Sequence, residues 1–416
     1  MTKARTLSER ILLTMVLVFT LALASAVVAT QSAQAQTFTV LYSFKDGADG
    51  GIPYSGLIQD SAGNLYGTTT QGGAGRFDCP DGCGTVFKLD TTGNETVLHS
   101  FGQTITDGQT PFYGYLFRDR AGNLYGTTYA GGADGNGTIF RVSPTGKETV
   151  VSFTGGANGG FPFAGLVPDA AGNAYGTTYG RGSGCPPYGC GTVFKVNSAG
   201  KITVLYSFTY GPDGGYPYAG LLRDSAGNLY GTTLDGGAIG DGTVFKVDAN
   251  GNETVLYSFC SQACADGANP SAGLVQDSAG NLYGTTLDGG AYGYGTVFKL
   301  DPTGQETVLY SFTGGTDGAL PWAGLVRDSA GNLYGTTVEG GLEDWGTVFE
   351  VNSTGQETVL YTFTGGADGC EPFSGLALDS AGNLYGTAAY CGTGGTVFKI
   401  SFDHVAEKRA QQRSYR

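Results

Sequence analysis

Short runs in which apolar and polar residues alternate recur along the chain, bounded by glycine, asparagine, aspartate or serine. In residues 357–363, Val359, Tyr361 and Phe363 occupy every second position and therefore share one face of an extended segment. This period of two predicts a half-buried strand. The preceding residues predict three more strands, over 324–328, 332–337 and 346–351. Because tight or glycine-rich connections separate them, the unit is expected to form a four-stranded antiparallel meander.

This unit occurs seven times. Its marker is the segment Asp-Ser-Ala-Gly-Asn-Leu-Tyr-Gly-Thr-Thr, which returns with small changes at intervals of 50–59 residues. The tyrosines of the seven copies are Tyr66, Tyr125, Tyr175, Tyr230, Tyr283, Tyr334 and Tyr385. Seven four-stranded units predict an all-β fold, a seven-bladed β-propeller with a repeat length close to kelch. A β-solenoid is the alternative, but its coils usually lack two successive tight hairpins.

The two ends of the repeat array are complementary. Residues 37–44 match the fourth strand of a unit, whereas the last copy stops after its third strand, Gly395–Ile400. The N-terminal strand is therefore expected to complete the last blade and to close the ring, which removes exposed sheet edges. The predicted propeller covers residues 36–400.

The repeat resembles the GloVer tandem repeat of exported bacterial proteins, often described as choice-of-anchor proteins. The resemblance is carried by the Asn-Leu-Tyr-Gly-Thr blocks (Asn-Ala-Tyr-Gly-Thr at 173–177) and the Gly-Thr-Val-Phe-Lys blocks. It also extends to the propeller repeats of bacterial sensor kinases. The family implies a β-propeller and no known catalysis. Members commonly carry a C-terminal sorting anchor, whereas the basic tail 401–416 has no apolar helix.

The N-terminus predicts export. Lys3, Arg5 and Arg10 precede the uncharged, mostly apolar run 11–29, and small residues follow up to Ala35. Residues 1–35 therefore look like a signal peptide, with an uncleaved membrane anchor as the alternative. We expect a secreted or periplasmic protein with no further membrane span, acting as a monomer. The net charge of −14 argues against nucleic-acid binding, and 12% aromatic residues argue against disorder.

Eight cysteines fit an oxidising compartment. Their spacing favours four local disulfides: Cys79–Cys83, Cys185–Cys190, Cys260–Cys264 and Cys370–Cys391. No CxxC motif occurs, and neither histidine is near these pairs, so no metal site is expected. All eight cysteines fall in the second-to-third and fourth-to-first strand connections, which are long and varied. These connections share one side of a propeller, here called the variable face, where binding usually resides.

Aromatic residues supply the ligand-binding candidates. One of them follows the repeated proline before the first strand in six copies, and Ser271 takes this position in the fifth. These aromatics could line the mouth of the channel and stack on sugar rings or protein side chains, although packing between blades is the alternative. Two further aromatics break the repeat in the variable loops. The candidates are Trp322, Trp345, Tyr294, Tyr54, Phe112, Tyr218 and Phe373.

Acidic residues leave other functions open. The fourth-to-first connections carry aspartates that could form a calcium site, but Asp-Gly before proline is also ordinary turn chemistry. These residues are Asp49, Asp107, Asp213, Asp266, Asp317 and Asp368. No nucleophile elbow is found, and no catalytic residue is assigned. The expected function is binding of an extracellular glycan or a surface protein, without a cofactor; the alternatives are a carbohydrate-active enzyme and a structural envelope component.

Overall fold

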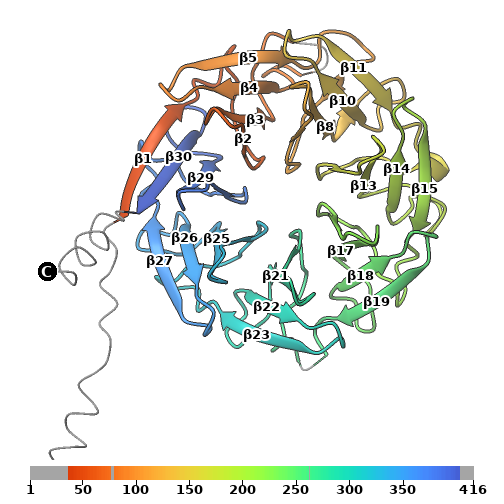
Figure 1. Ribbon diagram of the computed structural model, residues 1–416, viewed down its shortest axis with the longest axis vertical. Coiled ribbons are helices and arrows are strands. Elements are labelled where there is room, and N and C mark those ends of the chain that lie inside the picture. The colour runs from red at the N-terminus through yellow and green to blue at the C-terminus, as the bar shows by residue number, and fades with distance from the viewer. Residues whose placement is uncertain (1–35, 76–78, 262, 403–416) are drawn as a thin grey trace, which may run out of the picture. The chain divides into compact units, whose positions relative to one another are not determined.

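Seven four-stranded antiparallel sheets are arranged in a ring (Figure 1), so the all-β, seven-bladed propeller is confirmed. The computed structural model describes residues 36–75, 79–261 and 263–402. The chain divides into two units, and the propeller is the unit Thr37–Ser401. The predicted signal peptide and nearly all of the basic tail lie outside the described residues. Within the described ranges, no helix has the length and apolarity needed to cross a membrane.

Each blade runs outward from a short first strand to a long fourth strand. The first strands are β2 Ile58–Gln59, β7 Phe117–Arg118, β12 Val167–Pro168, β16 Leu222–Arg223, β20 Val275–Gln276, β24 Val326–Arg327 and β28 Ala377–Leu378. The second strands are β3 Leu65–Thr69, β8 Leu124–Thr128, β13 Ala174–Thr178, β17 Leu229–Thr233, β21 Leu282–Thr286, β25 Leu333–Thr337 and β29 Leu384–Ala388.

The third and fourth strands form the outer half of each blade. The third strands are β4 Thr85–Leu89, β10 Thr138–Val142, β14 Thr192–Val196, β18 Thr243–Val247, β22 Thr296–Leu300, β26 Thr347–Val351 and β30 Thr396–Phe402. The fourth strands are β5 Glu95–Ser100, β11 Glu148–Ser152, β15 Ile202–Ser207, β19 Glu253–Ser258, β23 Glu306–Ser311, β27 Glu357–Thr362 and, for blade 7, β1 Gln36–Ser43. Outside the blades, β6 Gly108–Gln109 pairs with β9 Ala130–Gly131, and Gly156–Asn158 forms a 3₁₀ turn.

The N-terminal strand closes the ring as predicted. The order in blade 7 is β1-β30-β29-β28, which places the first strand of the chain on the last one (Figure 1). The backbone N–H of Phe44 donates to the carbonyl of Gly395 at 2.9 Å, and that of Ile52 donates to Gly394 at 2.9 Å. Blade 7 therefore holds both ends of the propeller together.

The repeated Asp-Ser-Ala-Gly-Asn-Leu-Tyr segment forms the hairpin between the first and second strands. In the first copy, Asp60 accepts hydrogen bonds from the backbone N–H of Ala62 and Asn64 and from the hydroxyl of Tyr66, at 2.9–3.0 Å. Although burial opposes the charged form, these hydrogen bonds lower the pKa of Asp60. The repeated tyrosine is buried in three copies and half-buried in four. Its hydroxyl and the aspartate thus hold the hairpin together.

Phenylalanine pairs fill the seams between blades. The phenylalanine that directly follows each fourth strand meets a third-strand phenylalanine of the next blade edge to face, as Phe44 meets Phe87 at 5.1 Å. The same contact recurs at all seven seams with centroid distances of 5.0–5.4 Å. These rings are at most 1% exposed. At six of the seams they belong to the hydrophobic clusters that lie between neighbouring blades.

Candidate functional site

Aromatic side chains converge where the chain enters the first strands. We call Tyr54, Phe112, Tyr113, Phe163, Tyr218, Trp322 and Phe373 the aromatic collar. Each is half-buried, and neighbouring rings contact one another, with centroids 4.4 Å apart for Phe163 and Tyr218 and 5.8 Å apart for Trp322 and Phe373. Five of the seven predicted ligand-binding residues are therefore brought together here.

Tyr113 lies at the centre of the collar. Its ring centroid is 5.1 Å from Tyr54, 5.5 Å from Tyr218, 6.1 Å from Trp322 and 6.2 Å from Phe373. Alanine or serine follows the repeated Pro-x pair in the other six copies, so only blade 2 places an aromatic ring here.

The second copy also carries a one-residue insertion close to Tyr113. Asp119 follows Pro111 by eight residues, whereas the corresponding spacing in the other copies, such as Pro53 to Asp60, is seven. Sequence reasoning missed Tyr113 and its neighbour Tyr115, although this spacing was the available signal.

A cavity of about 270 Å³ lies next to the collar, at the axis of the propeller. Small and apolar residues that lead into the first strands of blades 2 to 7 line it, together with Tyr113, Tyr218, Trp322 and Phe373. Tyr115 crosses this space, because a Cβ on Gly56 of blade 1 or on Gly375 of blade 7 would lie about 2 Å from its ring or hydroxyl. The lengthened segment of blade 2 therefore supplies both Tyr113 and a ring that narrows the cavity.

Tyrosine is the sole ionisable residue type among the cavity-lining residues. Burial raises the pKa of Tyr113, Tyr115 and Tyr218 above the usual range, and these hydroxyls are neutral hydrogen-bond donors at physiological pH. The lining residues thus include no carboxylate or imidazole that could transfer a proton near neutral pH. The arrangement offers aromatic faces, an apolar interior and a few hydroxyls.

The other two aromatic candidates lie apart from the collar. Tyr294 is 43% exposed and packs over Gly314, and Trp345 is 39% exposed and packs over Gly365. Each covers a glycine of the fourth-to-first connection of its own blade. Another ring that sequence reasoning did not select, Tyr390, joins the collar through its hydroxyl, which hydrogen-bonds to that of Tyr54.

The repeated aspartates act in turns. Asp49 accepts hydrogen bonds from the hydroxyl of Tyr42 at 2.9 Å and the backbone N–H of Lys45 at 3.0 Å. Asp213 and Asp368 make the equivalent contacts in their own connections. This geometry supports the turn interpretation of these residues, since each carboxylate is already occupied by its own loop.

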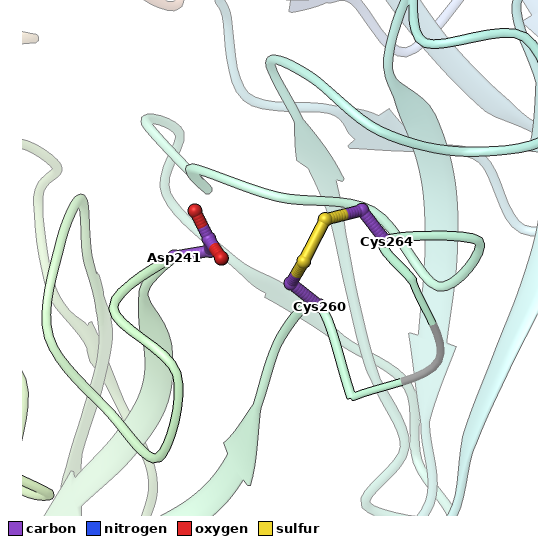
Figure 2. Close-up of side chains that lie close together, drawn as sticks. All are labelled: Asp241, Cys260 and Cys264. Atoms are coloured by element: carbon purple, nitrogen blue, oxygen red, sulfur yellow. A yellow bond between two sulfur atoms is a disulfide. The ribbon is translucent and has the colours of Figure 1, made fainter.

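All four predicted disulfides are present: Cys79–Cys83, Cys185–Cys190, Cys260–Cys264 and Cys370–Cys391. Asp241 lies beside the third of them (Figure 2), and its carboxylate and both sulfur atoms lie within 4.8 Å of one another. Because the sulfur atoms are bonded to each other, neither is a thiolate ligand, and this group is not a metal site in the oxidised protein.

Acidic side chains add negative charge to the variable face. Burial, and then the charge of Asp241, raise the pKa of Asp235 and Asp288. Burial and the charge of Glu339 raise that of Glu371. These side chains lie on connections of blades 4 to 7, whereas the collar is richest in the residues of blades 1 to 3.

Three solved structures align with this chain at low identity, and the first of them, with a TM-score above 0.5, shows the same fold. The extracellular domain of a protein assigned as a one-component system in B. thetaiotaomicron aligns with a TM-score of 0.54 and 13% identity, over 88% of this chain and 40% of that chain. A gluconolactonase from Xanthomonas campestris aligns with a TM-score of 0.45 and 14% identity, over 90% of this chain and 93% of that chain. A periplasmic gluconolactonase from Pseudomonas aeruginosa aligns with a TM-score of 0.47 and 16% identity, over 77% of this chain and 92% of that chain.

Sequence comparison gives a more specific result. No curated protein matches the chain. The family described as the Gloeobacter/Verrucomicrobia repeat matches three times, over residues 26–183, 76–278 and 261–411. Together these matches span the whole propeller, in agreement with its seven repeated blades. The chain therefore belongs to the Gloeobacter/Verrucomicrobia repeat family.

Proposed function

We propose that this protein is an exported binding module whose aromatic collar receives a glycan. The observation that carries the proposal is the convergence of seven half-buried aromatic rings at one end of an axial cavity. The propeller does not need these rings for its core, because the phenylalanine pairs at the seams are almost fully buried and fill that role. Aromatic side chains in a concave apolar site are typical of ligand binding.

A glycan suits the chemistry of the collar. Aromatic rings can pack against the apolar faces of sugar rings, and the hydroxyls of Tyr54, Tyr113 and Tyr218 supply hydrogen bonds at the same place. The lining of the cavity supports binding over hydrolysis, because its only ionisable side chains are tyrosines. The four disulfides support export to an oxidising compartment, secreted or periplasmic.

The two tryptophans provide a matched test. We expect an array of β-linked glucose, galactose and N-acetylglucosamine oligosaccharides to identify a ligand, whose affinity is then measured by calorimetry. Trp322→Ala should weaken binding by about 10-fold or more, as is common for a central aromatic anchor. Tyr113→Ala should do the same while keeping the fold, since alanine occupies the equivalent position in four other blades. Trp345→Ala, outside the collar, is the control.

Three results would contradict the proposal. One is the absence of any glycan ligand, and another is equal loss of affinity in the Trp322→Ala and Trp345→Ala proteins. The third is release of sugar products from a bound oligosaccharide, which would favour the carbohydrate-active enzyme instead.

A further inference from the structure

A recurring group of three side chains joins neighbouring blades at the outer edge of the ring. A tyrosine near the end of one fourth strand donates its hydroxyl to the aspartate of the next connection, at 2.7–2.9 Å. Burial, and then the charge of that aspartate, raise the pKa of the glutamate at or near the start of the fourth strand of the next blade. These seam triads are Tyr42/Asp49/Glu95, Tyr206/Asp213/Glu253, Tyr257/Asp266/Glu306 and Tyr310/Asp317/Glu357.

The seam between blades 1 and 2 differs in one residue. His99 takes the place of the tyrosine, whereas Asp107 and Glu148 keep the two carboxyl groups. The Nε2 atom of His99 lies 3.7 Å from Oδ1 of Asp107 and 3.5 Å from Oε2 of Glu148. An imidazole nitrogen and two carboxylate oxygens thus lie within 4.8 Å of one another.

These three side chains are almost completely buried, and some of their polar atoms lack hydrogen-bond partners. The side chains of His99, Asp107 and Glu148 are 10%, 5% and 12% exposed. Nε2 of His99 is buried without a hydrogen-bond partner, which is unusual for a buried polar atom. Oε1 of Glu148 also lacks a partner, as the same atom does in the glutamates of the four tyrosine triads, so the histidine nitrogen is what distinguishes this seam. An unoccupied nitrogen that faces two carboxyl groups in a nearly dry site points to a missing cation.

The side chains are also held in place. Asp107 accepts hydrogen bonds from the backbone N–H of Gln103 at 2.9 Å and of Gly108 at 2.8 Å. The ring of His99 packs edge to face on Phe101 at 4.9 Å. Such support from surrounding groups is what orients the ligands of metal sites in proteins.

We propose that His99, Asp107 and Glu148 bind a divalent transition-metal ion, preferentially Zn²⁺, at the seam of blades 1 and 2. Zinc takes histidine nitrogen and carboxylate oxygen at about 2.0–2.2 Å in a tetrahedral arrangement, and two ligands of such a tetrahedron are therefore about 3.4 Å apart. The observed separations of 3.5 and 3.7 Å match this value, although they are too long for good hydrogen bonds. A water molecule would complete the four ligands.

The metal would join two blades at the place where another bond between them is lost. At the other six seams, the threonine that directly follows the repeated Tyr-Gly donates its hydroxyl to a carbonyl of the next blade, at 2.7–3.2 Å. At the seam of blades 1 and 2, Oγ1 of Thr68 is buried without a partner. Blade 2 also carries the one-residue insertion close to Tyr113, and a zinc ion at the outer edge of the same seam would stabilise this part of the ring.

Sequence analysis expected no metal at the cysteines and considered Asp107 only as one of several aspartates that could bind calcium, without connecting it to His99 or Glu148. The three ligands come from a fourth strand, the following connection and the next fourth strand. Their separation in sequence hid the group.

The test is zinc titration of the tag-free exported chain after treatment with EDTA, followed by calorimetry and by melting temperature. We expect one ion per chain and a rise in melting temperature of about 3 °C or more when zinc exceeds its dissociation constant 100-fold. His99→Tyr restores the residue found at the other triads and should fold normally. It should weaken binding by more than about 100-fold, since even the partners that orient a ligand contribute about 10–100-fold.

Three further variants complete the test. Glu148→Gln keeps the shape of the side chain and should also lose the ion. His404→Gln changes the only other histidine and should bind zinc like the unaltered chain. Tyr206→His recreates the triad with Asp213 and Glu253 and should bring the stoichiometry to two. Absence of saturable binding, equal affinity in the His99→Tyr protein, or a single ion in the Tyr206→His protein would overturn the assignment.

Discussion

At the scale of single residues, glycine serves two different purposes in this protein. Most glycines at turns have positive φ, which other residues adopt with strain. The glycine of the Leu-Tyr-Gly block instead makes room for a core ring. In blade 4, a Cβ on Gly231 would lie 2.7 Å from Cζ of Phe245, the residue opposite it on the neighbouring strand. The repeated glycine is therefore a packing requirement of every blade.

Two glycines of the same blade test this distinction. Gly231→Ala should lower the free energy of unfolding by about 1–3 kcal/mol, because the added methyl group overpacks the core. Gly220→Ala is the control, since a Cβ there would meet its nearest atom at 3.8 Å, and its effect should stay within about 0.5 kcal/mol. Urea unfolding measures both. Equal stability of the two variants would show that the repeated glycine is not needed for packing.

At the scale of single elements, β1 is the strand on which ring closure depends. Its backbone pairs with β30, and the adjoining Phe44 is fully buried against Phe87 of blade 1. The strand therefore contributes both a sheet edge and a core residue to the joint between the ends of the propeller. Closure of this kind leaves the seventh sheet complete.

Loss of the Phe44 ring should open this joint. We expect Phe44→Ala to lower the free energy of unfolding by about 3–5 kcal/mol, the usual effect of removing a buried phenylalanine ring. Thr39→Ala, at an exposed position of β1, should stay within about 0.5 kcal/mol. Chemical unfolding followed by circular dichroism distinguishes the two. If both variants unfold at the same denaturant concentration as the unaltered chain, β1 does not hold the ring closed.

At the scale of the whole molecule, buried glutamates at the seams make stability depend on pH. Burial, and then the charge of the facing aspartate, raise the pKa of Glu95, Glu253, Glu306 and Glu357 from 4.5 to about 7. Between these two values the folded protein binds more protons than the unfolded chain, so its stability falls as pH rises. The stabilisation is complete below about pH 4.5 and is lost as pH passes through 7.

Thermal melting in EDTA should reveal this dependence. We expect the melting temperature to fall between pH 5 and pH 8, and Glu306→Gln to reduce the slope because one of the titrating groups is removed. Glu343→Gln, on an exposed loop, is the control and should leave the slope unchanged. A melting temperature that is constant or rises over this range would contradict the role of the seam glutamates.

The sequence predicted only part of the candidate site. The proline-aromatic pairs predicted that Tyr54, Phe112, Tyr218, Trp322 and Phe373 gather near the axis, because equivalent positions of a repeat occupy equivalent places in a ring. The same reasoning did not distinguish Tyr294 and Trp345 from the collar residues. These two side chains lie on the same face but pack over glycines of their own blades, outside the collar. It also missed Tyr113, where blade 2 carries an aromatic ring at a position that holds alanine or serine in the other copies.

The sequence by itself determined the number of blades, the strand order, the closure by residues 37–44 and the four disulfides. These features depend on a short period, on turn residues and on cysteines close in sequence, all of which are local. Only the tertiary structure decided that Tyr113 fills the centre of the collar and that His99 faces Asp107 and Glu148 across a seam. Such contacts depend on how inclined strands of adjacent blades pack, a geometry that no local pattern encodes.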